Sequence, residues 1–291
     1  MVPAPAYYLV ADHRYRQARL RSSIRHRFRI ATRRLAPRPL PDFLIIGAQR
    51  SGTTALHHLL ADHAGIRAPV RKEINFFTHN FHRGIGWYRA HFPISLLRGE
   101  RSWLTFESTP YYLYYPLAAR RAHTILPHGR LIAILRNPVD RAFSQYRLNV
   151  LKGRESRSFM DAIRAEEQQQ KAATERITEH RTVEDHIHDY YSYLSRGLYV
   201  DQLQHWLDFY GAERLLVLCF EEFRANATGE LRRVVDFLGL ARGDQLVVKN
   251  RGFEATRNQA IPYSSRSLLV DYFAPSNERL FQVVGRTFPW D

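Results

Sequence analysis

A glycine-rich turn after a short apolar run carries the clearest chemical signal in this sequence. The apolar residues 43–46 end at Gly47, a second glycine follows at Gly52, and the hydroxyl side chains of Thr53 and Thr54 come directly after it. This order predicts a buried strand, a tight loop and the start of a helix. In that arrangement, backbone N–H groups and the helix dipole bind a phosphate.

The loop has the G-x-x-x-x-G spacing of a nucleotide-binding P-loop, but its cation stands elsewhere. A P-loop kinase or NTPase places a lysine after the second glycine, where it binds the terminal phosphates. This sequence has Thr53 at that position and carries its cation inside the loop, as Arg50. The loop therefore favours a nucleotide other than ATP, and a P-loop kinase or NTPase remains the alternative enzyme class.

A second strand-to-helix junction repeats this arrangement further along the chain. The apolar residues 131–135 end at Arg136, Pro138 presets the first helical turn, and Ser144 lies within the predicted helix 138–151. Parallel sheets bind ligands at the carboxyl ends of their strands, so Arg136 is expected to face such a ligand. A salt bridge would explain Arg136 alone. When Arg136 is considered together with the first loop, a second phosphate site is the better interpretation of this junction.

These junctions resemble those of the sulfotransferases that use 3'-phosphoadenosine 5'-phosphosulfate (PAPS). The resemblance is closest to the heparan sulfate glucosaminyl N- and 3-O-sulfotransferases and their bacterial relatives. Residues 47–56 are similar to the family's 5'-phosphosulfate loop, and residues 135–144 to its 3'-phosphate motif. The resemblance extends over residues 42–291, because further segments fit in the correct order: 72–77, 82–88, 196–199 and 284–290.

The resemblance implies a sulfuryl donor, PAPS, that is bound without a metal and leaves as adenosine 3',5'-bisphosphate. Arg50 would stabilise the charge that develops on the leaving group, because a guanidinium does not readily give up its proton. His57 and His58 have no ligand-spaced partners, so a metal site is not expected. The donor-binding residues would be Gln49, Arg50, Ser51, Gly52, Thr53, Thr54, Arg136, Ser144 and Arg257.

The resemblance also implies a general base, Glu73, which would take the proton of an acceptor hydroxyl or amine. A surface ion pair with its neighbour Lys72 is the alternative role for Glu73. Glu107 is expected to support the site as a hydrogen-bond acceptor. Relatives have a lysine where this chain has Ser108, and Lys72 or Arg71 could compensate for it. The acceptor-side residues would be Lys72, Glu107 and Tyr111, and the acceptor a carbohydrate or glycolipid.

The sequence predicts the α/β class: one P-loop-type domain with a central parallel sheet covered by helices on both faces. Of the 291 residues, 45% are apolar, which is enough for a large core. Section 64–102 is expected to be loop-rich, and the polar section 152–195 to be helical and to help form the acceptor side. Strands are expected at 43–47, 103–107, 130–135 and 214–219, and helices at 53–63, 115–126, 138–151, 197–210, 227–238 and 276–285.

A basic segment precedes this domain. Residues 1–40 hold ten arginines and one acid, against a net charge of +15 for the whole chain. We interpret them as a helical N-terminal extension and residues 41–291 as the sulfotransferase domain. Within the extension, residues 12–35 suit an anionic membrane surface, and no nucleic-acid partner is expected. A solvated basic helix that packs on the body or stays mobile is the alternative interpretation of this segment. An inactive anion- or membrane-binding protein is the non-enzymatic alternative.

The cysteine content and the hydropathy of the sequence indicate in which cell compartment the protein is expected. Cys219 is the single cysteine, so no disulfide within the chain is possible, and no apolar run reaches the length of a membrane span. The first residues lack the apolar core of a signal peptide. We therefore expect a cytoplasmic protein, peripheral at the membrane through its basic extension.

Overall fold

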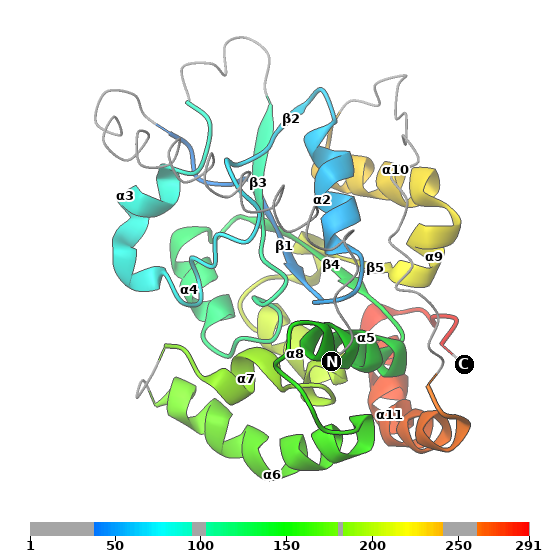
Figure 1. Cartoon of the computed structure of the whole chain (residues 1–291). Helices are drawn as coiled ribbons and strands as arrows, with labels where there is room; N and C mark the ends of the chain where they lie inside the picture. Colours follow the sequence, from blue (N-terminus) through cyan, green and yellow to red (C-terminus); the bar gives the residue numbers. More distant parts are fainter. Residues whose placement is uncertain (1–37, 95–102, 180–182, 241–260, 291) are drawn as a thin grey trace, which may run out of the picture.

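The computed structural model describes residues 38–94, 103–179, 183–240 and 261–290. Its centre is a five-stranded sheet in the order β2-β3-β1-β4-β5, in which all neighbouring pairs are parallel (Figure 1). This confirms the predicted α/β class. The strands are β1 (Phe43–Gly47), β2 (Ile66–Arg67), β3 (Leu104–Ser108), β4 (Arg130–Leu135) and β5 (Leu215–Cys219).

Strand β1 lies in the middle of the sheet and determines where a site can form. Ile45 pairs with Ser108 of β3 on one side and with Ile132 of β4 on the other. Because the three strands run in the same direction, their carboxyl ends share one edge of the sheet. The loop after β1, Thr109 after β3 and Arg136 after β4 therefore meet at that edge.

Helices cover both faces of the sheet, as its continuous apolar strands predicted. All five residues of β1 are buried, with Phe43 and Ile45 in the core of one face and Leu44 and Ile46 in the core of the other. The first face packs against α2 (Thr53–Ala61), α9 (Phe220–Ala225) and α10 (Ala227–Leu238), and the second against α4 (Ala118–Ile125) and α8 (Tyr199–Leu207).

A further group of helices lies together below the sheet in the view of Figure 1. Three of them, α5, α6 and α11, share an apolar core that includes Val139, Phe159 and Phe273. The helices of this group are α5 (Pro138–Leu151), α6 (Phe159–Thr178), α7 (His186–Tyr190) and α11 (Tyr263–Val284). Short elements complete the described chain: η1 (Phe81–Arg83), α3 (Gly84–Arg89), η3 (Ser195–Gly197) and η4 (Ala212–Arg214).

Helix α5 begins where its sequence predicted, because the capping signals are local. The Asn137 side chain accepts hydrogen bonds from the N–H groups of Val139 and Asp140, and Pro138 occupies the first helical position. These two residues satisfy or remove N–H groups that would otherwise lack partners. The cap thereby orients α5, which carries Ser144 toward the sheet edge.

The C-terminal region differs from its prediction. We expected a loop with a helix at 276–285, whereas α11 begins at Tyr263 and continues through Pro275. A proline inside a helix removes one backbone hydrogen bond and weakens the helical signal. The buried side chains of Leu269 and Phe273 hold the first half of α11 in place through tertiary packing. Section 64–102 is also more regular than expected, since it contains β2, η1 and α3.

The last residues of the predicted extension contact the domain. Arg38 is buried and donates a hydrogen bond from Nη1 to the Phe92 carbonyl at 2.7 Å, and Leu40 packs against the core. The described body therefore includes residues 38–40. The predicted membrane contact at residues 12–35 and the predicted donor contact Arg257 lie outside the described residues.

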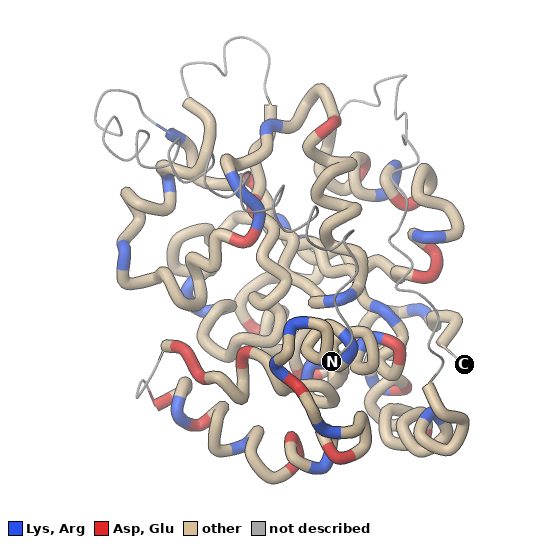
Figure 2. Tube along the Cα trace, viewed as in Figure 1, with Lys and Arg blue, Asp and Glu red and all other residues tan. Residues whose placement is uncertain are grey.

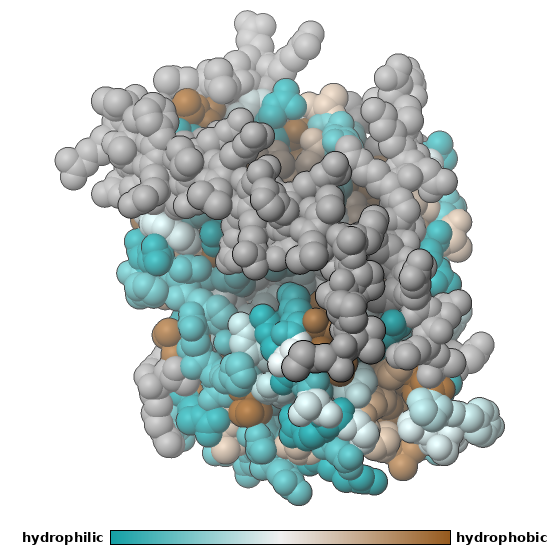
Figure 3. Space-filling view, viewed as in Figure 1, coloured by the Kyte–Doolittle hydropathy of each residue, from teal (hydrophilic) through white to brown (hydrophobic). Residues whose placement is uncertain are grey.

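The surface of the described body is mixed in charge. Figure 2 shows Lys and Arg residues interspersed with Asp and Glu over the helices and loops. In Figure 3 the face formed by α6 and α7 is mostly hydrophilic. In the part of the chain that the structure describes, no helix combines the length and the apolar character needed to cross a membrane.

Candidate active site

The loop after β1 is bonded to β4 and leads directly into α2. Ala48 N–H donates to the Ile134 carbonyl at 2.7 Å, which ties the loop to β4. Gly52 precedes α2 with a φ of 88°, and a Cβ there would lie 2.7 Å from the Phe220 ring. Glycine is therefore required on both backbone and steric grounds. No side chain caps α2, so the first N–H groups of the helix are available to an anion.

Arg50 links this loop to α5. Its Nε donates to Ser144 Oγ at 3.0 Å, and its backbone adopts a φ of 70°. A left-handed conformation is unfavourable for a residue with a side chain and persists where the surroundings enforce it. The structure thus brings together Arg50 of the first predicted anion site and Ser144 of the second.

Arg136 approaches the same place from the end of β4. Its Nη1 donates to the Arg50 carbonyl at 3.3 Å, and its guanidinium carbon lies 5.0 Å from the centre of the Phe220 ring. The Nε of Arg136 is buried and has no hydrogen-bond partner among the described residues. A buried donor without a partner is costly, and an anionic ligand would satisfy it.

The remaining loop residues of the predicted donor site differ in their accessibility. Ser51 and Thr53 are buried, and Ser51 N–H donates within the loop to Ala48 at 3.3 Å, whereas Thr54 is exposed on the first turn of α2. Gln49 was predicted to bind the donor. Its Oε1 accepts a hydrogen bond from Arg196 Nη1, and both side chains line a cavity described below.

Glu73 projects from a loop that is fastened to the end of β3. Its N–H donates to the Ser108 carbonyl at 3.0 Å, and Asn75 N–H donates to Thr109 Oγ1 at 3.2 Å. Glu73 has a φ of 58° and Asn75 a φ of 55°. Among the described residues other than glycine, positive φ occurs at these two and at Arg50. Such backbone strain concentrates at functional sites, and here it includes both residues predicted to be catalytic.

The side chain of Glu73 is half exposed, and Lys72 Nζ lies 2.7 Å from its Oε1. Arg71 donates from Nη2 to the backbone carbonyls of Glu73 and Ile74 at 3.5 and 3.4 Å. These bonds hold the guanidinium against the backbone of the loop. Of the two cations proposed to replace the lysine missing at Ser108, Lys72 is therefore the one beside the carboxylate.

Glu107 lies beneath this loop rather than on its surface. Its Oε1 accepts from Thr109 at 2.7 Å and Tyr112 at 2.6 Å, and its Oε2 accepts from Tyr88 at 2.5 Å. Burial raises the pKa of Glu107, and the three hydroxyl donors oppose that shift. These contacts fit the predicted supporting role. They do not place Glu107 against an acceptor, because its carboxylate is fully enclosed.

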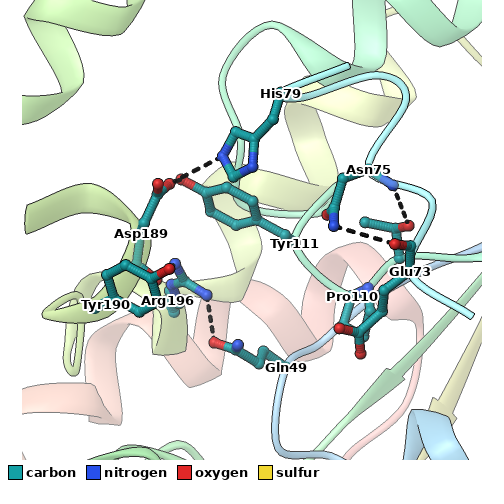
Figure 4. A pocket seen from close by; sticks show the side chains of 10 residues that line it. Gln49, Glu73, Asn75, His79, Pro110, Tyr111, Asp189, Tyr190 and Arg196 are labelled. Atoms are coloured by element: carbon teal, nitrogen blue, oxygen red, sulfur yellow. Dashed lines mark hydrogen bonds and ion pairs between the residues drawn. The ribbon is translucent and has the colours of Figure 1, made fainter. Parts of the chain in front are cut away.

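A cavity of about 220 Å³ opens next to Glu73 (Figure 4). Its wall combines the predicted residues Gln49, Glu73 and Tyr111 with residues that the sequence did not single out. Two of these come from α7 at the end of the polar section 152–195, for which we expected an acceptor-side role. The full lining is Gln49, Glu73, Asn75, His79, Thr109, Pro110, Tyr111, Asp189, Tyr190 and Arg196.

Helix α5 also holds α7 at the cavity. Gln145 Nε2 and Asn149 Nδ2 both donate to the Tyr190 carbonyl, at 2.9 and 2.7 Å. Lys152 is the C-cap residue of α5, and its positive charge interacts electrostatically with the charged side chains of Glu73 and Arg50. The pKa of Lys152 is lowered chiefly by burial. No local motif identifies these residues, because their roles depend on the packing of α5 against α7.

The described residues contain no group of three or more His, Cys, Asp or Glu side chains placed to bind a metal. His57 is buried behind the phosphate loop, where its ring contacts Phe106 with 4.9 Å between ring centres. Burial lowers the pKa of His57 to about 3, so the ring is neutral at physiological pH.

Two strand–loop–helix junctions on adjacent parallel strands, with a polar cavity beside them, define a P-loop-type α/β domain. Comparison with known proteins identifies the family to which this domain belongs. Residues 40–270 match the sulfotransferase domain, and the chain belongs to that family.

Three similar proteins illustrate the family. The chain is 31% identical over 274 residues to mouse heparan sulfate glucosamine 3-O-sulfotransferase 3B1, covering 87% of this chain and 65% of that protein. It is 30% identical to human heparan sulfate glucosamine 3-O-sulfotransferase 6, with 87% and 74% covered. The crystal structure of a sulfotransferase from Alicyclobacillus acidocaldarius superimposes with a TM-score of 0.68 at 30% identity, covering 86% of this chain and 98% of that one.

Proposed function

We propose that the protein transfers a sulfuryl group from PAPS to a hydroxyl or amine of a carbohydrate-type acceptor. The observation that carries this proposal is the convergence of Arg50, Ser144 and Arg136. A donor with phosphates on both the 5' and the 3' side needs two anion sites at one crevice. We assign one of these sites to the start of α2 and the other to the junction of β4 with α5.

The described residues fit such a donor. The uncapped start of α2 offers N–H groups to a 5'-phosphate, and the buried Nε of Arg136 offers an unsatisfied donor to a 3'-phosphate. When bound, PAPS supplies an activated sulfur whose bond to the 5'-phosphate oxygen breaks as the acceptor oxygen or nitrogen attacks. Arg50 would then stabilise the negative charge that collects on the departing phosphate.

Glu73 is the proposed base. Its carboxylate would take the proton of the acceptor group while the new bond to sulfur forms. Lys72, 2.7 Å from Glu73 Oε1, would bring positive charge toward the transferring group. The position of Glu73 at the mouth of the cavity supports this role, because an acceptor in the cavity would meet the carboxylate.

Binding of adenosine 3',5'-bisphosphate, compared with ATP and with AMP by calorimetry, tests the proposal. We expect the bisphosphate to bind at least tenfold more tightly than AMP, because AMP lacks the 3'-phosphate. Arg136→Ala should reduce bisphosphate affinity to near that of AMP and leave AMP binding within a factor of two. Equal or tighter binding of ATP would instead favour a P-loop kinase or NTPase.

The basic extension is proposed to contact an anionic membrane surface through residues 12–35. Because Arg38 and Leu40 pack on the body, a truncation should end at residue 37. We expect the truncated protein to keep its affinity for the bisphosphate and to lose binding to vesicles that contain phosphatidylserine. Unchanged vesicle binding would assign the membrane contact elsewhere. A cytoplasmic, membrane-peripheral location remains part of this proposal.

A further inference from the structure

Tyr199 and Trp290 belong to segments 196–199 and 284–290, which resemble the sulfotransferase family, yet neither side chain has a role in the site described so far. Their rings are in contact, with 5.8 Å between the ring centres. Trp290 also packs on Phe288, at 4.9 Å between ring centres, and its N–H donates to the Phe288 carbonyl at 2.8 Å. The segment after α11 therefore holds an indole beside the first residue of α8.

The peptide unit that joins Arg136 to Asn137 is bound on both sides by side chains. The pairing of β4 with β5 ends at the residue before Arg136. Just beyond it, Tyr199 donates its hydroxyl to the Arg136 carbonyl at 2.8 Å, and the Asn137 N–H donates to Glu221 Oε1 at 3.1 Å. Both polar groups of the peptide unit thus have partners. These bonds fix the plane of the unit and with it the direction in which the Arg136 side chain leaves the backbone.

Glu221 connects this peptide unit to Trp290. One carboxylate oxygen, Oε1, binds the peptide unit, and the other, Oε2, accepts from the indole Nε1 of Trp290 at 2.9 Å. A second contact joins the same two segments, because Arg286 Nη2 lies 3.0 Å from Glu222 Oε2. The segment after α11 is therefore fastened to the start of α9, and Trp290 contacts both side chains that bind the peptide unit.

The start of α9 also supports the far end of the Arg136 side chain. The ring centre of Phe220, the residue before Glu221, lies 5.0 Å from the guanidinium carbon. The buried Nε of this guanidinium is the donor that we assign to the 3'-phosphate. Groups that bind a ligand must be held to within about 0.5 Å of their working position. The contacts around Glu221 meet this need at both ends of the arginine.

We propose that Trp290 is a positioning residue for the 3'-phosphate site: through Glu221 and Tyr199 it holds Arg136 in the place where its Nε meets the phosphate. This inference rests on the sulfuryl-transfer function proposed above. The N–H groups that we assign to the 5'-phosphate belong to the start of α2, outside this set of contacts. Loss of Trp290 should therefore weaken binding of the 3'-phosphate and spare that of the 5'-phosphate.

Calorimetry with adenosine 3',5'-bisphosphate and with AMP tests the inference in the full chain. We expect Trp290→Ala to lower bisphosphate affinity at least about fivefold, the scale of one lost hydrogen bond, and to change AMP affinity less than about twofold. Trp87→Ala is the matched control. It removes another partly buried tryptophan, which stacks on Phe76 from α3, and should leave the ratio of the two affinities unchanged. An unchanged ratio in Trp290→Ala would overturn the inference.

A double-mutant cycle with Arg136 separates positioning from a general loss of structure. If Trp290 acts through Arg136, then Trp290→Ala should change bisphosphate affinity less than about twofold in a chain that already carries Arg136→Ala. A general weakening of the fold would lower the affinity by the same factor with and without Arg136. That second result would contradict the positioning role.

Trp290→Phe applies the same test with the packing retained. It keeps a ring against Tyr199 and lacks the Nε1 donor to Glu221, so it answers the question even if Trp290→Ala does not fold. We expect bisphosphate affinity to fall at least about twofold, and the Asn137 N–H to exchange with deuterium at least about fivefold faster by NMR. Exchange at the rate of the unmodified protein would overturn the inference without reference to any ligand.

The unmodified protein separates failure of this inference from failure of the proposed function. Equal affinity for the bisphosphate and AMP would overturn the proposed function and the inference with it. A preference for the bisphosphate that both Trp290 variants leave intact would overturn the inference alone.

Discussion

Arg50 Nε lies 3.0 Å from Ser144 Oγ, although 94 residues separate them in the chain. The bond crosses from the loop after β1 to the helix after β4, the two junctions that the sequence associates with opposite ends of one nucleotide. Pairing of β1 with β4 makes this approach possible, because Gly47 of β1 lies opposite Ala133 of β4. Arg50 is therefore positioned between the two proposed phosphate sites before any ligand arrives.

Replacement of Arg50 should affect turnover far more than binding. We expect Arg50→Ala to lower kcat by about 10²–10³-fold, the usual effect of losing one donor to a developing charge. Bisphosphate affinity should fall much less, because the N–H groups of α2 and Arg136 remain. Arg120→Ala, at an exposed position on α4, is the control for the loss of one positive charge. A kcat within threefold of the unmodified enzyme would remove Arg50 from the mechanism.

Replacement of Glu73 by glutamine should abolish proton transfer and keep the loop. We expect Glu73→Gln to bind the bisphosphate normally and to lose about 10²–10⁴-fold in kcat, the range supplied by a positioned base. Calorimetry and single-turnover sulfation would separate the two effects. Glu213→Gln changes an exposed carboxylate that does not line the cavity and should have little effect on either measurement. Near-normal turnover of Glu73→Gln would show that Glu73 is not the base and that its contact with Lys72 is a surface ion pair.

The hydroxyl of Tyr112 should matter for stability, because it connects three groups under the active-site loop. It donates to Glu107 Oε1 at 2.6 Å and accepts from the N–H groups of Phe76 and Phe77 at 2.8 and 3.2 Å. Tyr112→Phe leaves these buried groups without their partner, so we expect the free energy of unfolding in urea to fall by about 1–3 kcal/mol.

Tyr146→Phe provides the comparison for Tyr112→Phe. The Tyr146 hydroxyl donates to the Arg157 carbonyl in an exposed setting, where water can replace it. Its removal should change the free energy of unfolding by less than about 0.5 kcal/mol. Equal effects of the two substitutions would show that the contacts of Tyr112 do not stabilise the loop.

Stability should fall as the pH drops below the ordinary histidine range. Burial lowers the pKa of His57 to about 3 in the folded state, against about 6.5 when unfolded. Between these values the unfolded chain binds the additional proton, so the stabilisation is complete above pH 6.5 and is lost on acidification. At pH 5 the loss from His57 is about 2 kcal/mol, at about 1.4 kcal/mol per pH unit.

The substitution His57→Leu isolates that contribution. It removes the titrating ring from an apolar setting, so the free energy of unfolding should depend less steeply on pH between 5 and 6.5. His128→Leu, at an exposed position, should keep the slope of the unmodified protein. Urea unfolding at several pH values measures both. Identical slopes for His57→Leu and the unmodified chain would show that His57 remains accessible to protons in the folded state.

Much of the framework was predictable because its signals are local. Two strands and two helices have the predicted bounds: 43–47, 130–135, 138–151 and 227–238. Continuous apolar runs mark the strands. Asn137 and Pro138 mark the start of the first helix, and the left-handed Gly239 marks the end of the second. The first half of α11 was not predictable. Its helical state depends on burial of Leu269 and Phe273 against distant partners, and Pro275 obscures its local signal.

The primary structure alone was sufficient to predict the two strand–turn–helix junctions to which we assign the phosphate sites, because each lies within one continuous segment. It could not indicate the cavity, whose carboxylates Glu73 and Asp189 stand on separate loops and helices. Their relation arises from packing: β1 beside β3 anchors the loop of Glu73, and α5 holds α7 through Gln145 and Asn149. Such long-range contacts exist only once the sheet has formed, so the tertiary structure decides which residues line the cavity.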